Sequence, residues 1–351
     1  MTIRVGLVGV GNCASALVQS VEMHKHQPKL DPPAILARVK NYTPRDIVFT
    51  SAFDIDARKV DLDLSEAIFQ PPNNAAVIFK PPRLGAVVRP GPVLDGVPGG
   101  GLVSKIVEGT VDDVVRELHS TNTEILVNYL PTGARKAAEA YAEAALRAGV
   151  AFVNAMPAPV TSSAHWQKRF AERGVPLLGD DTQNQIGATV LHKSLIRLLA
   201  LRGVRVRRTY QINIGGTPDF LNLMYRHDDK VASKTAAVKT MAEGQEFDAY
   251  IAPVAYIRFL GDRKIAHMLI EAEIFGGLPV RIEVTLEVHD AWNSVAVVVD
   301  AVRLAKLALD RGIGGPLLSA SAWCFKNPPV HMSPEEAYRA VLEFIDGKRD
   351  R

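Results

Sequence analysis

The chain has 351 residues, of which 47% are hydrophobic and 23% charged, so its length fits about two domains of a globular protein. Its 41 basic and 38 acidic residues are interspersed and leave a net charge of only +3, so neither nucleic acid nor a membrane surface is an expected partner. No secretory leader and no run of roughly 18 apolar residues is present, so we expect a cytoplasmic protein. Two cysteines, Cys13 and Cys324, are too few for a zinc site, and we expect no metal centre.

The first predicted element is a buried parallel strand at residues 3–10, which leads through a glycine loop into a helix. The loop has the pattern G-x-G-x-x-A. Gly9 permits the tight turn, Gly11 lets the backbone approach a pyrophosphate, and Ala14 allows close helix packing. We interpret it as a dinucleotide site rather than as a turn that only packs. Its candidate cofactor contacts are Gly9, Gly11, Asn12, Cys13 and Ala14.

A second predicted strand ends in Asp54 and Asp56. An acidic residue at this position of the fold accepts hydrogen bonds from the adenosine ribose, and we assign that role to Asp54. It follows Ala14 by 54 − 14 = 40 residues, about twice the usual separation, because residues 25–46 form an insertion. An acid there favours NAD over NADP, although Arg58 lies nearby in the sequence.

Residues 70–102 are rich in proline and glycine and predict a loop with short strands, in which Asp95 is a further candidate for a cofactor contact. Alternating strands and helices then resume, and their strand ends should gather at the sheet edge where open α/β folds bind ligands. We expect Asn128 and Pro131 to contact the cofactor there. The polar strand ends lie at residues 128–133, 154–157 and 179–189.

After Gly203 the pattern changes to long alternating segments without crossover helices, which predict a second, largely antiparallel sheet. We therefore expect an α/β protein with an NAD-binding, Rossmann-like, doubly wound sheet in residues 1–199, completed by residues 291–351. Residues 200–290 would form an inserted α+β domain for catalysis and oligomerisation. Its strands have two faces to cover, so we expect sheet-to-sheet association between subunits.

Several sequence blocks occur in an order typical of one known family. They include VGVGNCASALVQ, VNYLPTG, PLLGDDTQNQIGAT, NIGGTPDFLNL, DKVASKTAAV, GDRKIAH and FKNPP. In these blocks the chain resembles the 1L-myo-inositol-1-phosphate synthase family, especially its shorter bacterial and archaeal members. The resemblance spans nearly the whole chain and implies a homotetramer.

The implied reaction converts D-glucose 6-phosphate to 1D-myo-inositol 3-phosphate with bound NAD. The sugar is oxidised at C5, enolised, closed by an intramolecular aldol step and reduced again, so there is no net redox change and the enzyme is an isomerase. Such a site must move protons, stabilise an oxyanion and hold a phosphate.

The resemblance assigns these tasks to a cluster of lysines. Desolvated ammonium groups beside other cations have a lowered pKa and act as bases, whereas charged neighbours stabilise an enolate or a phosphate. Asp181 and Asp300 would orient the lysines or the cofactor, and Asp181 is also a candidate cofactor contact. Alternatively, Asp180 and Asp181 cap the following helix. The matching lysines are Lys230, Lys234, Lys264 and Lys326.

The resemblance also implies a phosphate site at a helix amino terminus and polar contacts to the sugar hydroxyls. His192 and Lys193 either assist at the phosphate or have a structural role. The chain departs from its relatives at Gln183, Thr217, Pro218 and Leu309, which leaves a divergent paralogue or an NAD-dependent dehydrogenase for another sugar phosphate as alternatives, besides a non-catalytic NAD sensor. The candidate substrate contacts are Asn184, Gln185, Gly187, Ala188, Thr189, Asn213, Asp219 and Asn222.

Overall fold

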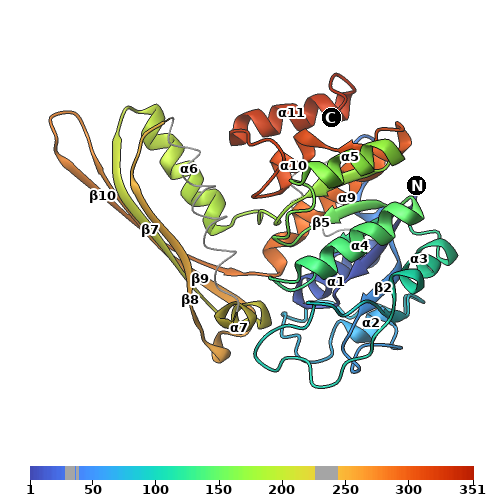
Figure 1. Cartoon of the computed structure of the whole chain (residues 1–351). Coiled ribbons are helices and arrows are strands. Elements are labelled where there is room, and N and C mark those ends of the chain that lie inside the picture. Colours follow the sequence, from blue (N-terminus) through green and yellow to red (C-terminus); the bar gives the residue numbers. More distant parts are fainter. Residues whose placement is uncertain (28–35, 37–38, 226–243) are drawn as a thin grey trace.

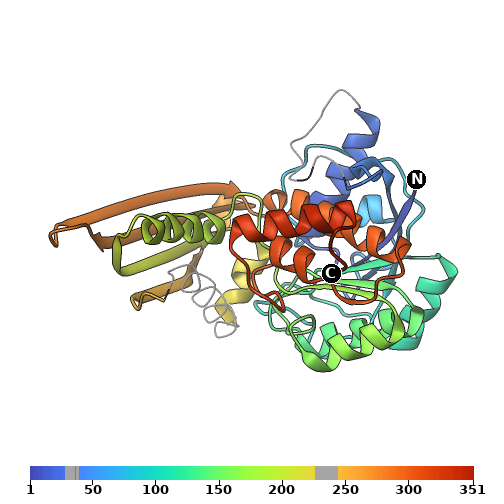
Figure 2. The same cartoon turned by 90° about the horizontal axis from the view of Figure 1, so that it is seen from above.

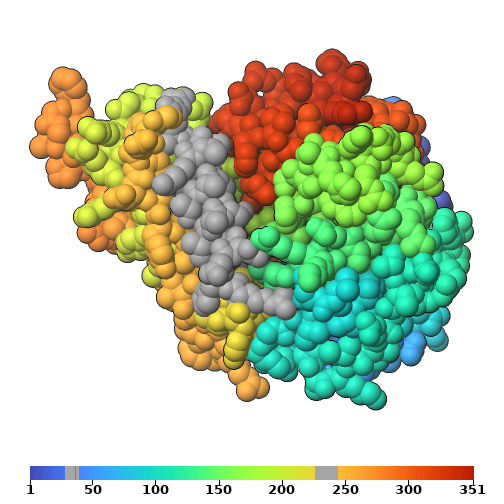
Figure 3. All heavy atoms as spheres, viewed as in Figure 1, coloured from blue at the N-terminus to red at the C-terminus, as the bar shows by residue number. Residues whose placement is uncertain are grey.

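The structure is a computed structural model of the whole chain, and it describes residues 1–27, 36, 39–225 and 244–351. Two sheets form two lobes, and helix α7 (Pro218–Tyr225) lies where the lobes meet (Figure 1). Seen from above, the second sheet extends sideways from the first lobe (Figure 2). The tip of the hairpin formed by the last two strands of the second sheet projects beyond the rest of the surface (Figure 3).

The first sheet has seven strands, and every pairing in it is parallel. Its inner strands are apolar and almost wholly buried, as a parallel sheet covered by helices on both faces requires. This confirms the predicted doubly wound sheet. From one edge to the other, the strands are β11 (Gly315–Pro316), β6 (Pro176–Gly179), β5 (Ala151–Asn154), β4 (Ile125–Asn128), β1 (Ile3–Val8), β2 (Ile47–Asp54) and β3 (Val88–Pro90).

The helices of the first lobe cover both faces of this sheet (Figures 1 and 2). Helices α1 and α9 pack together on one face, and α9 crosses strands β1, β4, β5 and β6. The late helix α9 thus packs against the first sheet. The helices of this lobe are α1 (Asn12–His26), α2 (Leu64–Ala67), α3 (Val111–Ser120), α4 (Arg135–Ala148), α5 (Ala164–Arg173), α9 (Val295–Asp310), α10 (Leu318–Cys324) and α11 (Pro334–Asp346), with 3₁₀ turns η1 (Pro44–Asp46) and η3 (Trp292–Ser294).

The second sheet has the strand order β10-β9-β7-β8. Two of its pairings are antiparallel, but β7 and β8 pair in parallel because the chain between them crosses over through α7. The strands are β7 (Arg205–Gly215), β8 (Asp248–Tyr256), β9 (Arg263–Glu273) and β10 (Pro279–His289), with the 3₁₀ turn η2 (Arg258–Leu260) after β8.

Helix α6 (Ala188–Leu201) covers one face of the second sheet. Its buried Ile196 and Leu199 form a small core with Val206, Ile251 and Ile270 of the strands. Helix α6 thus packs with the second sheet rather than with the first. None of the described helices is long and apolar enough to span a bilayer.

Candidate active site

A cavity of about 270 Å³ lies between the carboxyl edge of the first sheet and the second lobe. The glycine loop after β1 and the ends of β2 and β4 line one side. The first residues of α6, helix α7 and the first residues of β9 line the other side. The predicted site residues that line it are Gly9, Gly11, Asn12, Cys13, Asp54, Pro131, Asp181, Asn184, Gly187, Ala188, Thr189, Asn213, Asp219, Asn222, Lys264 and Lys326.

The glycine loop has the backbone geometry that its sequence predicts. Gly9 has a φ of +80°, and a Cβ there would lie 2.8 Å from the carbonyl oxygen of Tyr129. A Cβ at Gly11 would meet nothing within 4 Å, so the open space beside it faces the cavity that it lines. A ligand phosphate can therefore approach the loop at Gly11, next to the N–H groups that begin α1.

Asp54 lines the cavity, but its carboxylate also shapes the glycine loop. Oδ2 accepts a hydrogen bond from the N–H of Val10 at 2.8 Å, and Oδ1 accepts from the N–H groups of Ile55 and Asp56. Lys59, which the sequence analysis missed, is only 4% exposed and donates from Nζ to the Val10 carbonyl at 2.9 Å. Asp54 and Lys59 thus hold both polar groups of the Val10 residue in place.

Two predicted cofactor residues lie outside the cavity lining. Ala14 is fully buried in α1, which is the packing role that its small size predicts. Asn128 is also fully buried; its Nδ2 donates to Asn154 Oδ1 at 2.9 Å, and its Oδ1 accepts from the Leu130 N–H at 3.1 Å. Asn128 therefore positions the loop that carries Pro131.

Asp180 continues this buried row of polar strand ends. It accepts hydrogen bonds from Asn154 Nδ2 and from the N–H groups of Thr161 and Ser162. Burial raises the pKa of Asp180 to about 6, even though these donors favour the carboxylate. Helix α6 begins at Ala188 without a side-chain cap, so neither Asp180 nor Asp181 has the capping role considered above.

Two lysine–aspartate pairs form the most polar part of the cavity. Lys326 Nζ lies 2.8 Å from Asp181 Oδ1, and Lys264 Nζ lies 2.7 Å from Asp290 Oδ1. Asn184 Nδ2 also donates to Asp290 Oδ1, at 3.1 Å. The sequence analysis missed Asp290, because the end of an exposed strand gives no signal of its own.

Backbone contacts bring Lys326 to Asp181, although 145 residues separate them. The N–H of Lys326 donates to the carbonyl of Asp181 at 2.7 Å, and Asp180 and Asn327 exchange two backbone hydrogen bonds. Asp181 is only 4% exposed and its Oδ2 has no hydrogen-bond partner in the described structure. A buried carboxylate oxygen without a donor is a favourable contact for an N–H or O–H group of a ligand.

Of the other predicted catalytic residues, the structure describes only Asp300, which does not line this cavity. Lys230 and Lys234 lie outside the described residues. Asp300 is fully buried in α9, where it pairs with Arg303 and accepts a hydrogen bond from the Leu36 N–H at 3.2 Å. Burial raises the pKa of Asp300 to about 6 against the opposing effect of Arg303. The prediction that Asp300 orients the lysines or the cofactor is corrected: its helix turns it toward Leu36 and Arg303.

At the start of α6, Gly187, Ala188 and Thr189 line the cavity. The first turn of this helix has no acidic residue, so its free N–H groups remain available to an anion. Gln185, by contrast, is exposed and not part of the lining; its N–H donates to the carbonyl of Asn293 at 2.8 Å. Gln185 thus joins the turn before α6 to η3, and the substrate contact expected there stays a prediction.

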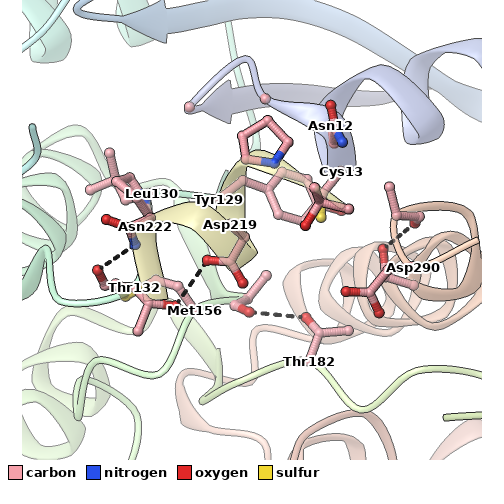
Figure 4. A pocket seen from close by; sticks show the side chains of 18 of the residues that line it. Asn12, Cys13, Tyr129, Leu130, Thr132, Met156, Thr182, Asp219, Asn222 and Asp290 are labelled. Carbon is pink, nitrogen blue, oxygen red and sulfur yellow. Dashed lines mark hydrogen bonds between the residues drawn. The ribbon is translucent and has the colours of Figure 1, made fainter. Parts of the chain in front are cut away.

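The polar residues around α7 mainly tie the two lobes together. Asn222 accepts from the Gly99 N–H at 2.9 Å and donates to the Thr132 carbonyl at 3.1 Å, and Asp219 accepts from the Thr132 hydroxyl (Figure 4). Pro218 begins α7, where its missing N–H costs the helix nothing. These residues place α7 against the strand ends of the first lobe.

Among the described residues, no group of three or more His, Cys, Asp or Glu side chains is arranged to hold a metal ion. The fold and the cavity define a Rossmann-like α/β protein with a dinucleotide-type loop on one side of the site and paired charges on the other.

Comparison with known proteins identifies the family. The family model "Myo-inositol-1-phosphate synthase" matches residues 187–291. The chain is 42% identical to the inositol-3-phosphate synthase of Mycolicibacterium smegmatis over 98% of both proteins, and 42% identical to that of Corynebacterium glutamicum over 97% of both. A myo-inositol-1-phosphate synthase-related protein from Thermotoga maritima superposes with a TM-score of 0.83 at 25% identity, covering both chains completely. The chain therefore belongs to the myo-inositol-1-phosphate synthase family.

Proposed function

We propose that the protein is an NAD-dependent isomerase that converts D-glucose 6-phosphate to 1D-myo-inositol 3-phosphate. The main support for this proposal is structural: two lysine–aspartate pairs line the same cavity as a dinucleotide-type glycine loop. A dehydrogenase needs one acid–base group beside its cofactor. Two largely buried ammonium groups suit a reaction in which the site must also stabilise an enolate and the alkoxide formed in the aldol step.

The residues present fit NAD. The open space beside Gly11 and the N–H groups at the start of α1 suit a pyrophosphate, and the absence of a Cβ atom at Gly11 allows its approach. When bound, NAD would take a hydride from C5 of the sugar and return it after ring closure. Asp54 carries a negative charge at the edge of this region, which supports NAD over a cofactor with an additional phosphate.

Lys326 and Lys264 supply the acid–base chemistry in this proposal. Each ammonium group is largely buried, with 13% of its side chain exposed, and is held by one carboxylate oxygen. As a neutral amine Lys326 can take the proton of a substrate hydroxyl, and as the resulting ammonium it can return that proton, while Asp181 keeps the nitrogen oriented. Lys264, anchored by Asp290, can donate a hydrogen bond to an oxygen that gains negative charge during enolisation or ring closure. Lys230 and Lys234 remain candidates for the same cluster.

The phosphate of the sugar would bind at the start of α6. Gly187 is the residue before the helix, and the N–H groups of Ala188 and Thr189 have no acceptor within the helix. Asn184 lies beside them and also contacts Asp290. This arrangement would hold the phosphate at one end of the sugar and present the reacting carbons to the two lysines.

The alternative is an NAD-dependent dehydrogenase of another sugar phosphate. Incubation with glucose 6-phosphate and a small amount of NAD separates the two. The isomerase forms an inositol phosphate far in excess of NAD without accumulation of NADH, whereas a dehydrogenase forms NADH in proportion to its product. A protein that binds NAD and forms neither would be the non-catalytic sensor.

We also propose that the protein is a cytoplasmic homotetramer in which residues 1–199 with 291–351 bind the cofactor and 200–290 serve catalysis and assembly. The face of the second sheet opposite α6 exposes Tyr210, Tyr250 and Val254, which supports association through this sheet. Light scattering coupled to gel filtration tests the tetramer. A monodisperse monomer at micromolar concentration would contradict it.

A further inference from the structure

A row of polar side chains runs through the otherwise apolar layer between β7 and α6. Thr209, Gln211 and Asn213 alternate along β7, face α6 and are at most 5% exposed. Their neighbours on the adjacent strand β9 are Ile270, Met268 and Ala266 in the same order. Burying polar groups at such positions is unfavourable unless they are hydrogen-bonded.

His192 of α6 joins this row and is itself fully buried. Its Nε2 lies 2.7 Å from Thr209 Oγ1 and its Nδ1 lies 3.2 Å from Gln211 Oε1. Gln211 Nε2 donates to Asn213 Oδ1 at 3.0 Å, and Asn213 Nδ2 donates to the Ala252 carbonyl at 3.0 Å. The chain of contacts thus connects the histidine to two residues that line the cavity, Gln211 and Asn213.

The carbonyl of Ala252 determines the direction of these hydrogen bonds. A carbonyl only accepts, so the amide nitrogen of Asn213 must face it and the amide oxygen must face Gln211. By the same argument Gln211 turns its nitrogen to Asn213 and its oxygen to His192. An acceptor opposite Nδ1 requires a hydrogen on Nδ1.

The other end of this row of hydrogen bonds is also a backbone carbonyl. The Thr209 hydroxyl lies 2.6 Å from the carbonyl oxygen of Leu269 and near Nε2 of His192, and its one hydrogen serves either acceptor. A doubly protonated imidazole would satisfy both nitrogens, but burial lowers the pKa of His192 to about 4 and favours the neutral ring. A neutral ring with its hydrogen on Nδ1 leaves Nε2 to accept from Thr209.

We propose that His192, as the neutral Nδ1–H tautomer, is a positioning residue that fixes the amides of Gln211 and Asn213 in the cavity wall beside Lys264. Gly215, two residues beyond Asn213 on β7, pairs with Lys264, and Asn213 pairs with Ala266. The orientation of the Asn213 amide therefore determines which polar group lies next to the strand that carries Lys264. His192 acts on the reaction through this wall and touches no reacting atom.

The first test is the ¹⁵N spectrum of the histidine side chains of the full-length protein at pH 7. The His192 signals are assigned by their loss in His192→Asn. We expect a protonated Nδ1 and an unprotonated Nε2. A protonated Nε2 with a bare Nδ1 would overturn the inference, and this result does not depend on enzymatic activity.

The second test rests on the proposed function and compares two amide variants. In His192→Asn the side-chain nitrogen can take the place of Nδ1, whereas in His192→Gln it reaches the place of Nε2. We expect His192→Asn to retain most of kcat and His192→Gln to lose about tenfold, with the Kd of NAD unchanged in both, because small displacements of site residues lower kcat. The control on the same helix is Ser194→Ala, whose side chain is exposed and should leave kcat unchanged.

Equal kcat values for the two variants, or a higher value for His192→Gln, would contradict the positioning role. If either variant fails to fold, Gln211→Glu tests the same step, since a carboxylate cannot donate to Asn213 and should lower kcat at least as much as His192→Gln. A wild-type protein that is inactive with glucose 6-phosphate would count against the proposed function, while the tautomer measurement would still decide this inference.

Discussion

The two sides of the cavity are built in different ways. The cofactor side consists mainly of backbone groups from consecutive residues, in which Gly9 permits the tight turn, Gly11 leaves space and α1 presents its N–H groups. The opposite side consists of side chains from distant segments, in which Asp181 meets Lys326 and Lys264 meets Asp290. A local backbone motif can bind a common cofactor, whereas the chemistry specific to one sugar needs charges assembled by the whole fold.

Removal of Lys326 should have the largest effect on the reaction. In Lys326→Ala, Asp181 keeps a buried carboxylate without its cation, and the site loses an acid–base group. We expect kcat to fall by about 10³-fold, as when a positioned charge is removed from other active sites. Steady-state formation of inositol phosphate measures it, and the exposed Lys348, paired with Asp346, gives the control Lys348→Ala. A loss smaller than tenfold would place the chemistry elsewhere.

Replacement of Lys264 tests the second pair. Lys264→Met keeps the length of the side chain and removes its charge, so Asp290 loses its ammonium partner and keeps the hydrogen bond from Asn184. We expect kcat to fall by about 10²-fold while the Kd of NAD stays within twofold, because the cofactor side is built separately. Fluorescence titration with NAD provides the Kd. A large loss of NAD affinity would show that the two sides are not independent.

Substitutions of the two glycines test the cofactor side of the cavity. Gly11→Ala has space for its methyl group in the free protein, so we expect normal thermal stability but at least tenfold weaker NAD binding. Gly9→Ala meets the Tyr129 carbonyl in a left-handed backbone conformation and should also lose about 1–3 kcal/mol of stability. Titration and thermal unfolding measure both. Equal stability losses for the two variants would contradict the proposed division of roles.

The smallest effect on kcat is expected for Asp300, although its effect on stability should be large. Asp300→Ala leaves Arg303 fully buried without its carboxylate, which should lower the free energy of unfolding by about 3–5 kcal/mol. The folded fraction should keep kcat within twofold, because Asp300 is not part of the cavity lining. Denaturant unfolding and kinetics at low temperature test this. A selective loss of kcat without a stability change would restore its predicted catalytic role.

The sequence predicted those parts of the molecule that depend on neighbouring residues. Continuous apolar runs predicted the parallel sheet, and the spacing of Gly9 and Gly11 after the first strand predicted the loop. It did not predict Asp290 or Lys59, because a single charged residue at a strand or turn end looks like any solvated position. It misplaced Asp300, since the direction in which a helix turns one carboxylate depends on how the helix packs. The parallel pairing of β8 likewise depends on a crossover that alternation alone does not indicate.

The most direct test of the account uses glucose 6-phosphate that carries deuterium at C5, together with an excess of unlabelled NADH in solution. If oxidation and reduction occur within one turnover in this cavity, the inositol phosphate retains the deuterium at the carbon derived from C5. We expect full retention of the deuterium. Loss of the label into the dissolved NADH pool, with unlabelled product, would contradict it.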